Sequence, residues 1–215
     1  MTLPPTLLPP MIAAIDKAIA DNATEVTALD QAIGDGDHVI NLQRGLAVLM
    51  AQREELSQLA WPAAWQKIGM ILMSTVGGAS GSLYGTLFIA LSKAAYQQTL
   101  DLPDFAHDFM QAVTAVKQRG KADAGEKTML DVYIPVADYL QQSAAEGVAL
   151  ATVLENVSAV AVAGMESTRD MVATKGRASF LEERSLGHID AGAKTAQLMI
   201  CAIVAVLSEH LASPA

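Results

Sequence analysis

The 215-residue chain is apolar and acidic: 52% of its residues are hydrophobic, 17% are charged, and 23 acidic against 14 basic residues give a formal net charge of -9. A chain of this size and composition can bury one substantial core, so we expect a single domain over residues 1–215. The negative charge disfavours binding to nucleic acid or to an anionic membrane surface, so an anionic ligand would need a metal ion or backbone amides.

The apolar segments favour a cytoplasmic protein. The longest run, AQLMICAIVAVL at residues 196–207, is shorter than the roughly 20 residues of a membrane-spanning helix. We interpret it as a buried helix, in which Cys201, the only cysteine, is expected to be a small buried side chain. The N-terminal segment MTLPPTLLPPM has no basic residue and contains paired prolines, which is not typical of a secretory signal.

The chain predicts an all-α fold, because apolar residues recur at helical spacing and strand patterns are nearly absent. With glycine and proline as boundary signals, the pattern predicts eight helices, near residues 9–29, 39–53, 61–75, 81–98, 103–119, 127–144, 149–174 and 191–212. Pro135 should kink the sixth of them. Short connections make sequential helices antiparallel neighbours, so we expect one eight-helix barrel or bundle.

Alternate connections of such a barrel lie at the same end. The first, third, fifth and seventh connections hold nearly all of the glycine-rich sequence and of the candidate functional residues, in the segments IGDGDH, VGGASGS, RGKADAGEKT and KGRASFLEERSLGHIDAG. The other connections look like ordinary surface loops. Four segments far apart in the chain should therefore meet at one end of the barrel. This arrangement predicts a functional site in loops on a rigid scaffold.

The first of these segments gathers Asp30, Asp35 and Asp37 around two glycines. A turn through the glycines can bring the three carboxylates together, and they repel one another unless a cation neutralises them. Oxygen ligands at this density suit Mg²⁺, Mn²⁺ or Ca²⁺ rather than zinc, and we favour magnesium with a phosphate ligand. The alternative is a solvated acidic turn that caps the next helix, and His38 either faces the phosphate or caps that helix.

The second segment, VGGASGS at residues 76–82, lies between two predicted helices. Its amides, with those of the following helix N-terminus, can form a cradle for an anion. It is not a Walker loop, because no GK[ST] follows it. The alternative is that the glycine pair only permits a tight turn between two helices.

The last segment is rich in basic groups, namely Lys175, Arg177, Arg184 and His188. Arg177 is the candidate for stabilising the charge of a transferring phosphoryl group. The alternative, which we leave open for Arg184, is that these cations pair with Glu182 and Glu183 on the surface. Asp190 directly precedes the last predicted helix and can act as its N-cap.

Taken together, LDQAIGDGDHVIN, STVGGASGSLYGTLF, RGKADAGEKTMLDV and TKGRASFLEERSLGHIDAGAKTAQ resemble the L subunit (DhaL) of dihydroxyacetone kinase, which is also found as the nucleotide-binding domain of single-chain dihydroxyacetone kinases. The resemblance covers residues 29 to 200. It implies an eight-helix barrel that holds ADP and two Mg²⁺ ions at one end. The implied metal ligands are Asp30, Asp35 and Asp37, and the implied nucleotide-binding residues are His38, Asn41, Ala79, Ser80, Gly120, Met129, Arg177, Asp190, Ala191 and Gly192.

The resemblance also implies a function. In the phosphotransferase-system type of this family, which we favour for this chain, ADP is a recycled cofactor that a DhaM-type phosphohistidine subunit charges to ATP, and the γ-phosphoryl group then passes to dihydroxyacetone on a DhaK-type subunit. Met129 would contact the base and Ser80 the phosphate, and a transcription regulator is a candidate third partner. Two alternatives stay open: the nucleotide-binding subunit of an ATP-dependent short-ketose kinase, and a catalytically silent regulatory or scaffold homologue.

Overall fold

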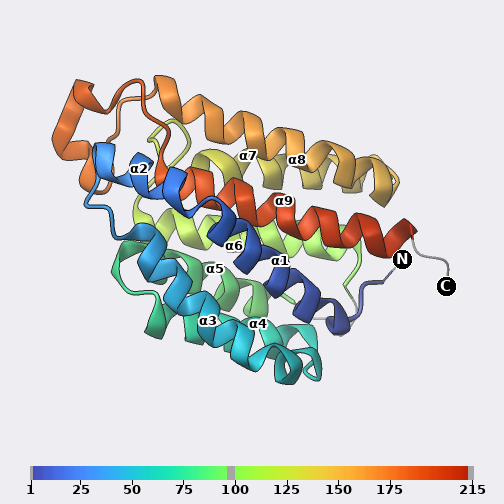
Figure 1. Cartoon of the computed structure of the whole chain (residues 1–215). Coiled ribbons are helices and arrows are strands. Elements are labelled where there is room, and N and C mark those ends of the chain that lie inside the picture. Colours follow the sequence, from blue (N-terminus) through green and yellow to red (C-terminus); the bar gives the residue numbers. More distant parts are fainter. Residues whose placement is uncertain (1, 96–99, 213–215) are drawn as a thin grey trace.

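The computed structural model describes residues 2–95 and 100–212, and its regular structure there is helical. The long helices are α1 (Leu8–Asp21), α2 (Ala23–Ile33), α3 (His38–Ser57), α4 (Trp61–Thr75), α5 (Gly78–Ala94), α6 (Leu102–Gly120), α7 (Leu130–Ala145), α8 (Leu150–Ser167) and α9 (Ala191–Ala212) (Figure 1). The described residues also form three 3-10 helices, namely η1 (Pro5–Leu7), η2 (Thr168–Asp170) and η3 (Arg177–Ser185). The prediction of an all-α fold is confirmed.

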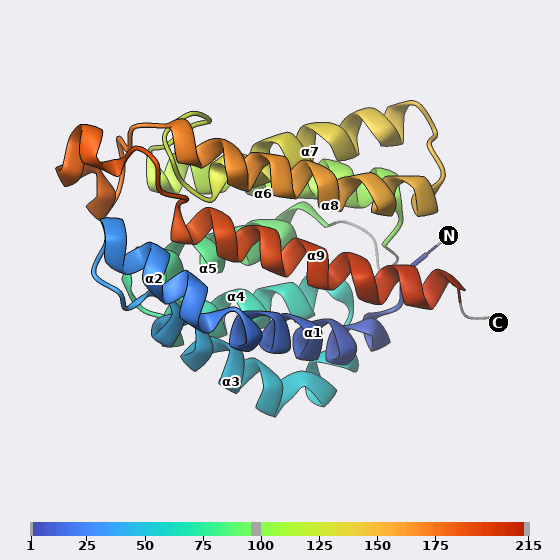
Figure 2. The ribbon, with the colours of Figure 1, turned by 45° about the horizontal axis from the view of Figure 1, so that its top comes forward.

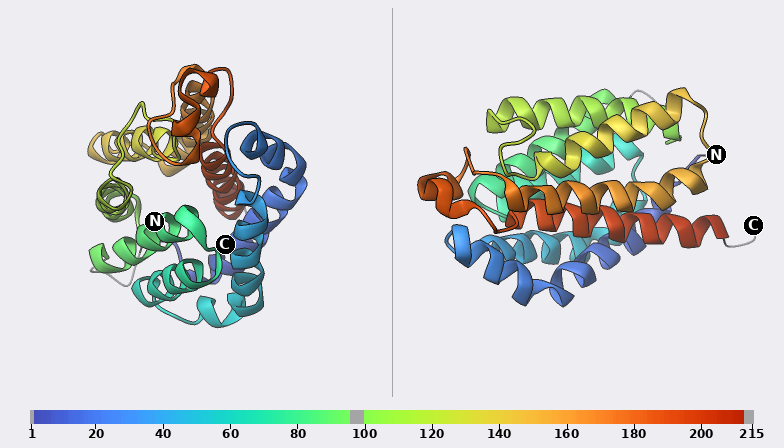
Figure 3. Two further views of the ribbon diagram at one scale, coloured as in Figure 1. Left: turned by 90° about the vertical axis from the view of Figure 1, so that its left-hand side faces the viewer. Right: turned by 90° about the horizontal axis from the view of Figure 1, so that it is seen from above.

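The helices form a closed ring. From α3 to α9 each long helix packs against the next one in the chain, and α9 packs against α1, which packs against α3. The end-on view in Figure 3 shows this barrel, in which α1 and α2 together take the place of the first predicted helix. The segment between α8 and α9 and the connection between α2 and α3 lie at one end, opposite the C-terminal end of α9 (Figures 1 and 2).

Several boundaries differ from the predicted ones. α3 continues to Ser57 rather than ending near residue 53, and α5 begins at Gly78 rather than near residue 81. The predicted end of that helix, near residue 98, lies outside the described residues.

Asn22, with φ -105° and ψ 9°, separates α1 from α2, and its side chain donates to Ala18 O at 2.8 Å. Asparagine competes in this way with helical backbone bonds. α8 ends at Ser167 rather than near residue 174, and α7 begins at Leu130 rather than near residue 127. Pro135 lies inside α7, and the kink predicted there stays a prediction.

The barrel interior is apolar and includes a row of aromatic rings from α4, α6 and α7. Trp61, Trp65, Phe105, Phe109 and Tyr133 follow one another with ring centroids 5.3 to 6.4 Å apart. Neighbouring rings at such distances stabilise a core beyond their buried area. The interior therefore gives the loops at the barrel end a rigid support.

Helices α4 and α5 approach each other closely at two glycines. A Cβ on Gly69 would lie 2.9 Å from Gly85 O and 2.9 Å from Ile89 N, and a Cβ on Gly85 would lie 3.0 Å from Gly69 O. A larger side chain at either position would push the helices apart. The contact thus sets where the N-terminus of α5, which faces the loop end of the barrel, can lie.

Among the described helices, α9 is long and apolar enough to cross a bilayer, with a mean hydropathy of 1.6 over its most apolar window. In the barrel it lies against α1, α7 and α8, and 39% of that window is buried. Ala193, Ala196 and Leu207 are buried there. Cys201 is only partly buried, contrary to the expectation for it, and its Sγ lies 3.3 Å from Gln197 Nε2.

Candidate functional site

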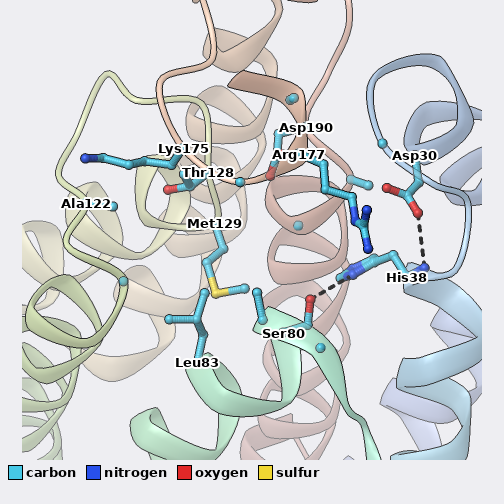
Figure 4. Close-up of a pocket in the computed structure, with 18 of the residues that line it drawn as sticks. Asp30, His38, Ser80, Leu83, Ala122, Thr128, Met129, Lys175, Arg177 and Asp190 are labelled. Atoms are coloured by element: carbon cyan, nitrogen blue, oxygen red, sulfur yellow. Dashed lines mark hydrogen bonds between the residues drawn. The ribbon is translucent and has the colours of Figure 1, made fainter. Parts of the chain in front are cut away.

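A cavity of about 570 Å³ opens at the loop end of the barrel (Figure 4). All four predicted segments contribute to its lining. The structure brings together in this lining every residue proposed above as a metal ligand, nucleotide contact or catalytic group, namely Asp30, Asp35, Asp37, His38, Asn41, Ala79, Ser80, Gly120, Met129, Arg177, Asp190, Ala191 and Gly192.

Three carboxylates form one side of the cavity. Asp30 lies in the last turn of α2, and Asp35 and Asp37 follow in the loop. One oxygen from each lies within 4.8 Å of the others. Gly34 permits this arrangement, because a Cβ there would collide with the Asp30 carboxylate, and Gly36 has a φ of +76°. Hard oxygen donors at this spacing, partly open to solvent, suit Mg²⁺ and its retained waters.

The cap of α3 separates the metal interpretation from the acidic-turn alternative. Asp37 occupies the N-cap position, but its side chain makes no capping hydrogen bond. Asp30 Oδ2 instead accepts from the His38 amide at 3.1 Å. One carboxylate of the three therefore stabilises the helix start, and helix capping does not explain the other two.

His38 connects the cavity to a buried polar chain. Its Nδ1 lies 3.0 Å from Ser80 Oγ, and its Nε2 lies 2.9 Å from Thr195 Oγ1. Thr195 Oγ1 is also 3.0 Å from the Tyr84 hydroxyl. Burial lowers the pKa of His38, against the opposing effect of Asp30 and Asp37, which favours a neutral imidazole between two hydroxyls.

Sequence reasoning missed Thr195 and Tyr84, because nothing in their local pattern distinguishes them from other helix residues. Burial raises the pKa of Tyr84 to about 12, so it acts as a neutral hydrogen-bonding group. The chain from Tyr84 through Thr195 to His38 orients the imidazole and thereby Ser80 at the cavity wall.

The N-terminus of α5 forms a second side of the cavity. Gly77 and Gly78 have φ values of +76° and +59°, which glycine adopts without strain. The first backbone bond of the helix runs from Gly81 N to Gly77 O, so the amides of Gly78, Ala79 and Ser80 have no acceptor within the helix. With the positive end of the helix dipole they form a site suited to an anion, and the glycine pair makes the tight turn as well.

The side of the cavity away from the carboxylates is apolar. Leu83, Val116, Ala122 and Met129 line it, and Figure 4 shows the Met129 side chain pointing toward Leu83. Gly120 lies nearby, where a Cβ would be 3.4 Å from Leu83 Cδ2. Such a wall suits a flat apolar group beside the charged half of the cavity.

The segment between α8 and α9 covers the cavity with charged groups. Arg177 Nε lies 2.7 Å from Asp35 Oδ2, rather than beside Glu182 or Glu183. Lys175 lines the cavity too and pairs with Glu126 at 3.4 Å. Of the four basic residues in this segment, Arg184 and His188 are not in the described lining.

Asp190 is the N-cap of α9, as one interpretation predicted, and it also lines the cavity. Its Oδ2 accepts from the Ala193 amide at 2.8 Å. Burial raises the pKa of this carboxyl to about 6, against the opposing effects of that hydrogen bond and of Lys127. Lys127, which sequence reasoning did not single out, is itself buried.

Comparisons with known proteins agree with this architecture. The model of the DAK2 domain family matches residues 32–205. The "PEP-dependent dihydroxyacetone kinase 1, ADP-binding subunit DhaL" of Listeria innocua is 40% identical over 186 residues, which cover 86% of this chain and 88% of the relative. The corresponding Escherichia coli subunit is 40% identical over 81% of this chain and 84% of its own. A Lactococcus lactis subunit named as PTS-dependent is 37% identical over 92% and 95%.

Solved structures show the same fold. The dihydroxyacetone kinase of C. freundii in complex with AMP-PNP and Mg²⁺ superimposes with a TM-score of 0.71 at 22% identity, and the match covers 95% of this chain and 34% of that one. The native form of that enzyme gives a TM-score of 0.70 at 23% identity. At this identity the likeness extends to the fold alone.

Proposed function

This chain belongs to the DAK2 domain family, and from that membership we propose that it is the ADP- and magnesium-binding subunit of a dihydroxyacetone kinase. ADP stays bound as a recycled cofactor, a DhaM-type phosphohistidine subunit charges it to ATP in place, and the γ-phosphoryl group passes to dihydroxyacetone on a DhaK-type subunit. The whole chain acts as one nucleotide-binding domain in the cytoplasm. Relatives that match this chain over more than four fifths of both lengths carry the corresponding name, which supports the proposal.

The observation that carries the proposal is the pairing, in one cavity, of three carboxylates with the open N-terminus of α5. Asp30, Asp35 and Asp37 would hold two Mg²⁺ ions, which supply positive charge to phosphate oxygens. The amides of Ala79 and Ser80 would bind a phosphate group directly. An anion bound there would thus be neutralised from both sides, although the chain as a whole is acidic.

The other lining residues have roles that follow from their positions. Met129 and Leu83 would contact the base, at the apolar end of the cavity. His38, fixed by Thr195, would hold the Ser80 hydroxyl toward the phosphate. Asn41, Gly120, Asp190, Ala191 and Gly192 complete the enclosure, and Arg177 would stabilise charge on the transferring phosphoryl group.

The proposed chemistry consists of positioning and charge neutralisation, which is most of what phosphoryl transfer requires of a protein. The hydroxyl that receives the phosphoryl group belongs to the substrate on the partner subunit, so this chain needs no general base. A transcription regulator stays a candidate partner. The ketose itself is recognised by the partner.

Two other functions make different predictions. A subunit of an ATP-dependent kinase for short ketoses would turn over with free ATP alone. A silent scaffold would keep the fold without binding nucleotide, but three carboxylates within 4.8 Å of one another would then cost stability, because the exposed Arg177 on Asp35 offsets only part of their repulsion.

The test is to purify the protein without added nucleotide, denature it, and identify the released molecules by chromatography and mass spectrometry, with and without EDTA treatment beforehand. We expect one ADP per chain, which EDTA removes. Adding a phosphohistidine donor should convert it to ATP on the protein. A preparation that lacks nucleotide and turns over with free ATP would reject the recycled cofactor in favour of an exchanging substrate.

A further inference from the structure

Lys127 is a buried cation in the wall of the cavity, with 1% of its surface exposed. Its ammonium donates to three backbone carbonyls: to Thr168 O at 2.5 Å, to Met171 O at 3.3 Å, and to His188 O. An ammonium has three protons, so all of them are used within the protein. Lys127 therefore has no donor left for a phosphate, even though it lines the cavity.

The local backbone directs this side chain inward. The Asp131 carboxylate, in the first turn of α7, accepts from Gly125 N at 2.5 Å and from Thr128 N at 2.7 Å. Between these two bonds Lys127 has a φ of +60°, a conformation that residues other than glycine rarely adopt. Such a conformation persists where the surroundings determine it. Here the hydrogen bonds from the ammonium to the three carbonyls stabilise it.

The three acceptors lie at the two ends of one segment. Thr168 and Met171 are at the start of the connection between α8 and α9, and His188 is at its end. Lys127 thus joins both ends of this segment to each other and to the loop that precedes α7. A backbone hydrogen bond from Gly187 N to Arg169 O, 2.8 Å long, also joins the two ends of the segment.

A second, more exposed connection joins the same two loops farther out. Glu126 Oε1 accepts from Thr174 Oγ1 at 2.9 Å and lies 3.4 Å from Lys175 Nζ. The segment held in this way carries Arg177 and leads into Asp190, and the loop before α7 leads into Met129. The two connections therefore set the position of the charged segment, which carries Arg177 and Asp190, relative to the apolar wall of the cavity, which includes Met129.

We propose that Lys127 is a positioning residue that holds the two ends of the 168–190 segment together and against the loop before α7, so that the cavity is formed before nucleotide binds. Removing the ammonium leaves three carbonyls without a donor and removes the bonds that hold both ends of the segment to the loop before α7, so that the bond from Gly187 N to Arg169 O has to hold the two ends without Lys127. Nucleotide binding must then order the segment, and the free energy that this ordering costs lowers the affinity for nucleotide. The affinity part of this proposal rests on the proposed nucleotide-binding function, whereas the closure of the segment does not.

The test compares Lys127→Met with Lys121→Met, which makes the same change at an exposed lysine of the same loop that also has a positive φ. Amide hydrogen exchange is followed by mass spectrometry without nucleotide and with saturating Mg²⁺-ADP, and Mg²⁺-ADP affinity is measured by calorimetry. In Lys127→Met we expect exchange to rise about tenfold or more in residues 121–128 and 168–189, with the remaining barrel unchanged. Affinity should fall about tenfold, and saturating Mg²⁺-ADP should restore protection of both segments.

Each other outcome has a distinct meaning. Unchanged exchange in the two segments, or an equal rise throughout the barrel, overturns the positioning role. If Lys127→Met does not fold, Lys127→Arg decides: its planar fork cannot reach three separate carbonyls as an ammonium does, so a smaller rise confined to the same segments is expected. If the unaltered protein binds no Mg²⁺-ADP, the proposed function fails, while the exchange measurement still tests Lys127.

Discussion

Arg177 and Asp35 form an ion pair across the mouth of the cavity, with Nε 2.7 Å from Oδ2. The pair joins the segment between α8 and α9 to the loop between α2 and α3. The Arg177 side chain is 71% exposed, so the pair contributes little to stability. Arg177 supplies part of the positive charge that the three carboxylates require, and a divalent cation bound there would compete with it for Asp35.

Asp35→Asn should abolish bound nucleotide and the stabilisation that nucleotide confers. A ligand at about 100 times its Kd stabilises a protein by about 2.7 kcal/mol, and this gain with Mg²⁺-ADP should vanish in the variant because one metal ligand is lost. Thermal unfolding with and without Mg²⁺-ADP measures it. Asp21→Asn, which removes an exposed acid paired with Lys17, should keep the gain, and retention of both nucleotide and gain by Asp35→Asn would refute the metal assignment.

Arg177→Ala should separate transfer from binding. With the partner subunits we expect turnover to fall about 100-fold or more, because an arginine that stabilises transferring phosphoryl charge acts in the transition state. Bound ADP and the free energy of unfolding should change little, since the side chain is exposed. Arg184→Ala, in the same segment but outside the described lining, is the control. Loss of ADP from Arg177→Ala would instead make Arg177 a binding residue.

Asp190→Asn should stabilise the nucleotide-stripped protein at neutral pH. Burial raises the pKa of this carboxyl in the folded state to about 6, above the value of 3.8 for a free group. The folded protein therefore binds the proton more tightly, and this group lowers the free energy of unfolding as the pH rises from about 4 to about 6. The full effect above pH 6 is about 3 kcal/mol at most.

Asparagine is as good an N-cap as aspartate, so the variant should keep the bond to the Ala193 amide without the buried charge. Urea unfolding at pH 5, 6, 7 and 8 should show its advantage over the unaltered protein shrinking as the pH falls. A variant that is less stable at every pH would mean that the ionised carboxylate stabilises the fold, with Lys127 offsetting its burial.

Thr195→Val should destabilise the fold and weaken nucleotide binding together. It leaves His38 Nε2 and the Tyr84 hydroxyl without their shared partner in the core, and we expect a loss of about 2 kcal/mol. Thr195→Ser keeps the hydroxyl and should recover most of both properties. Thr114→Val, which removes an exposed hydroxyl bonded within its own helix, controls for the change in side-chain type. Unaltered stability in Thr195→Val would show that the polar chain is dispensable.

Helical periodicity and the order of the loops were enough to predict the all-α barrel and the end that carries the site. Both depend on local pattern: apolar spacing predicts helices, and short connections make neighbours antiparallel, so alternate loops meet. The cluster of Asp30, Asp35 and Asp37 could be predicted for the same reason, since its members lie close together in the sequence, at the end of one helix and in the loop that follows it. The other predicted site residues depended on the four motifs that resemble a known family.

Tertiary structure alone decided which groups from distant segments meet. His38 and Thr195 are 157 residues apart, and Lys127 reaches carbonyls more than 40 residues away. From the sequence, Arg177 could either pair with the surface glutamates or face the cavity, and the fold pairs it with Asp35 at the cavity. Side chains choose such partners only when helix packing has set which faces oppose one another, and a local pattern contains no information about the opposing face.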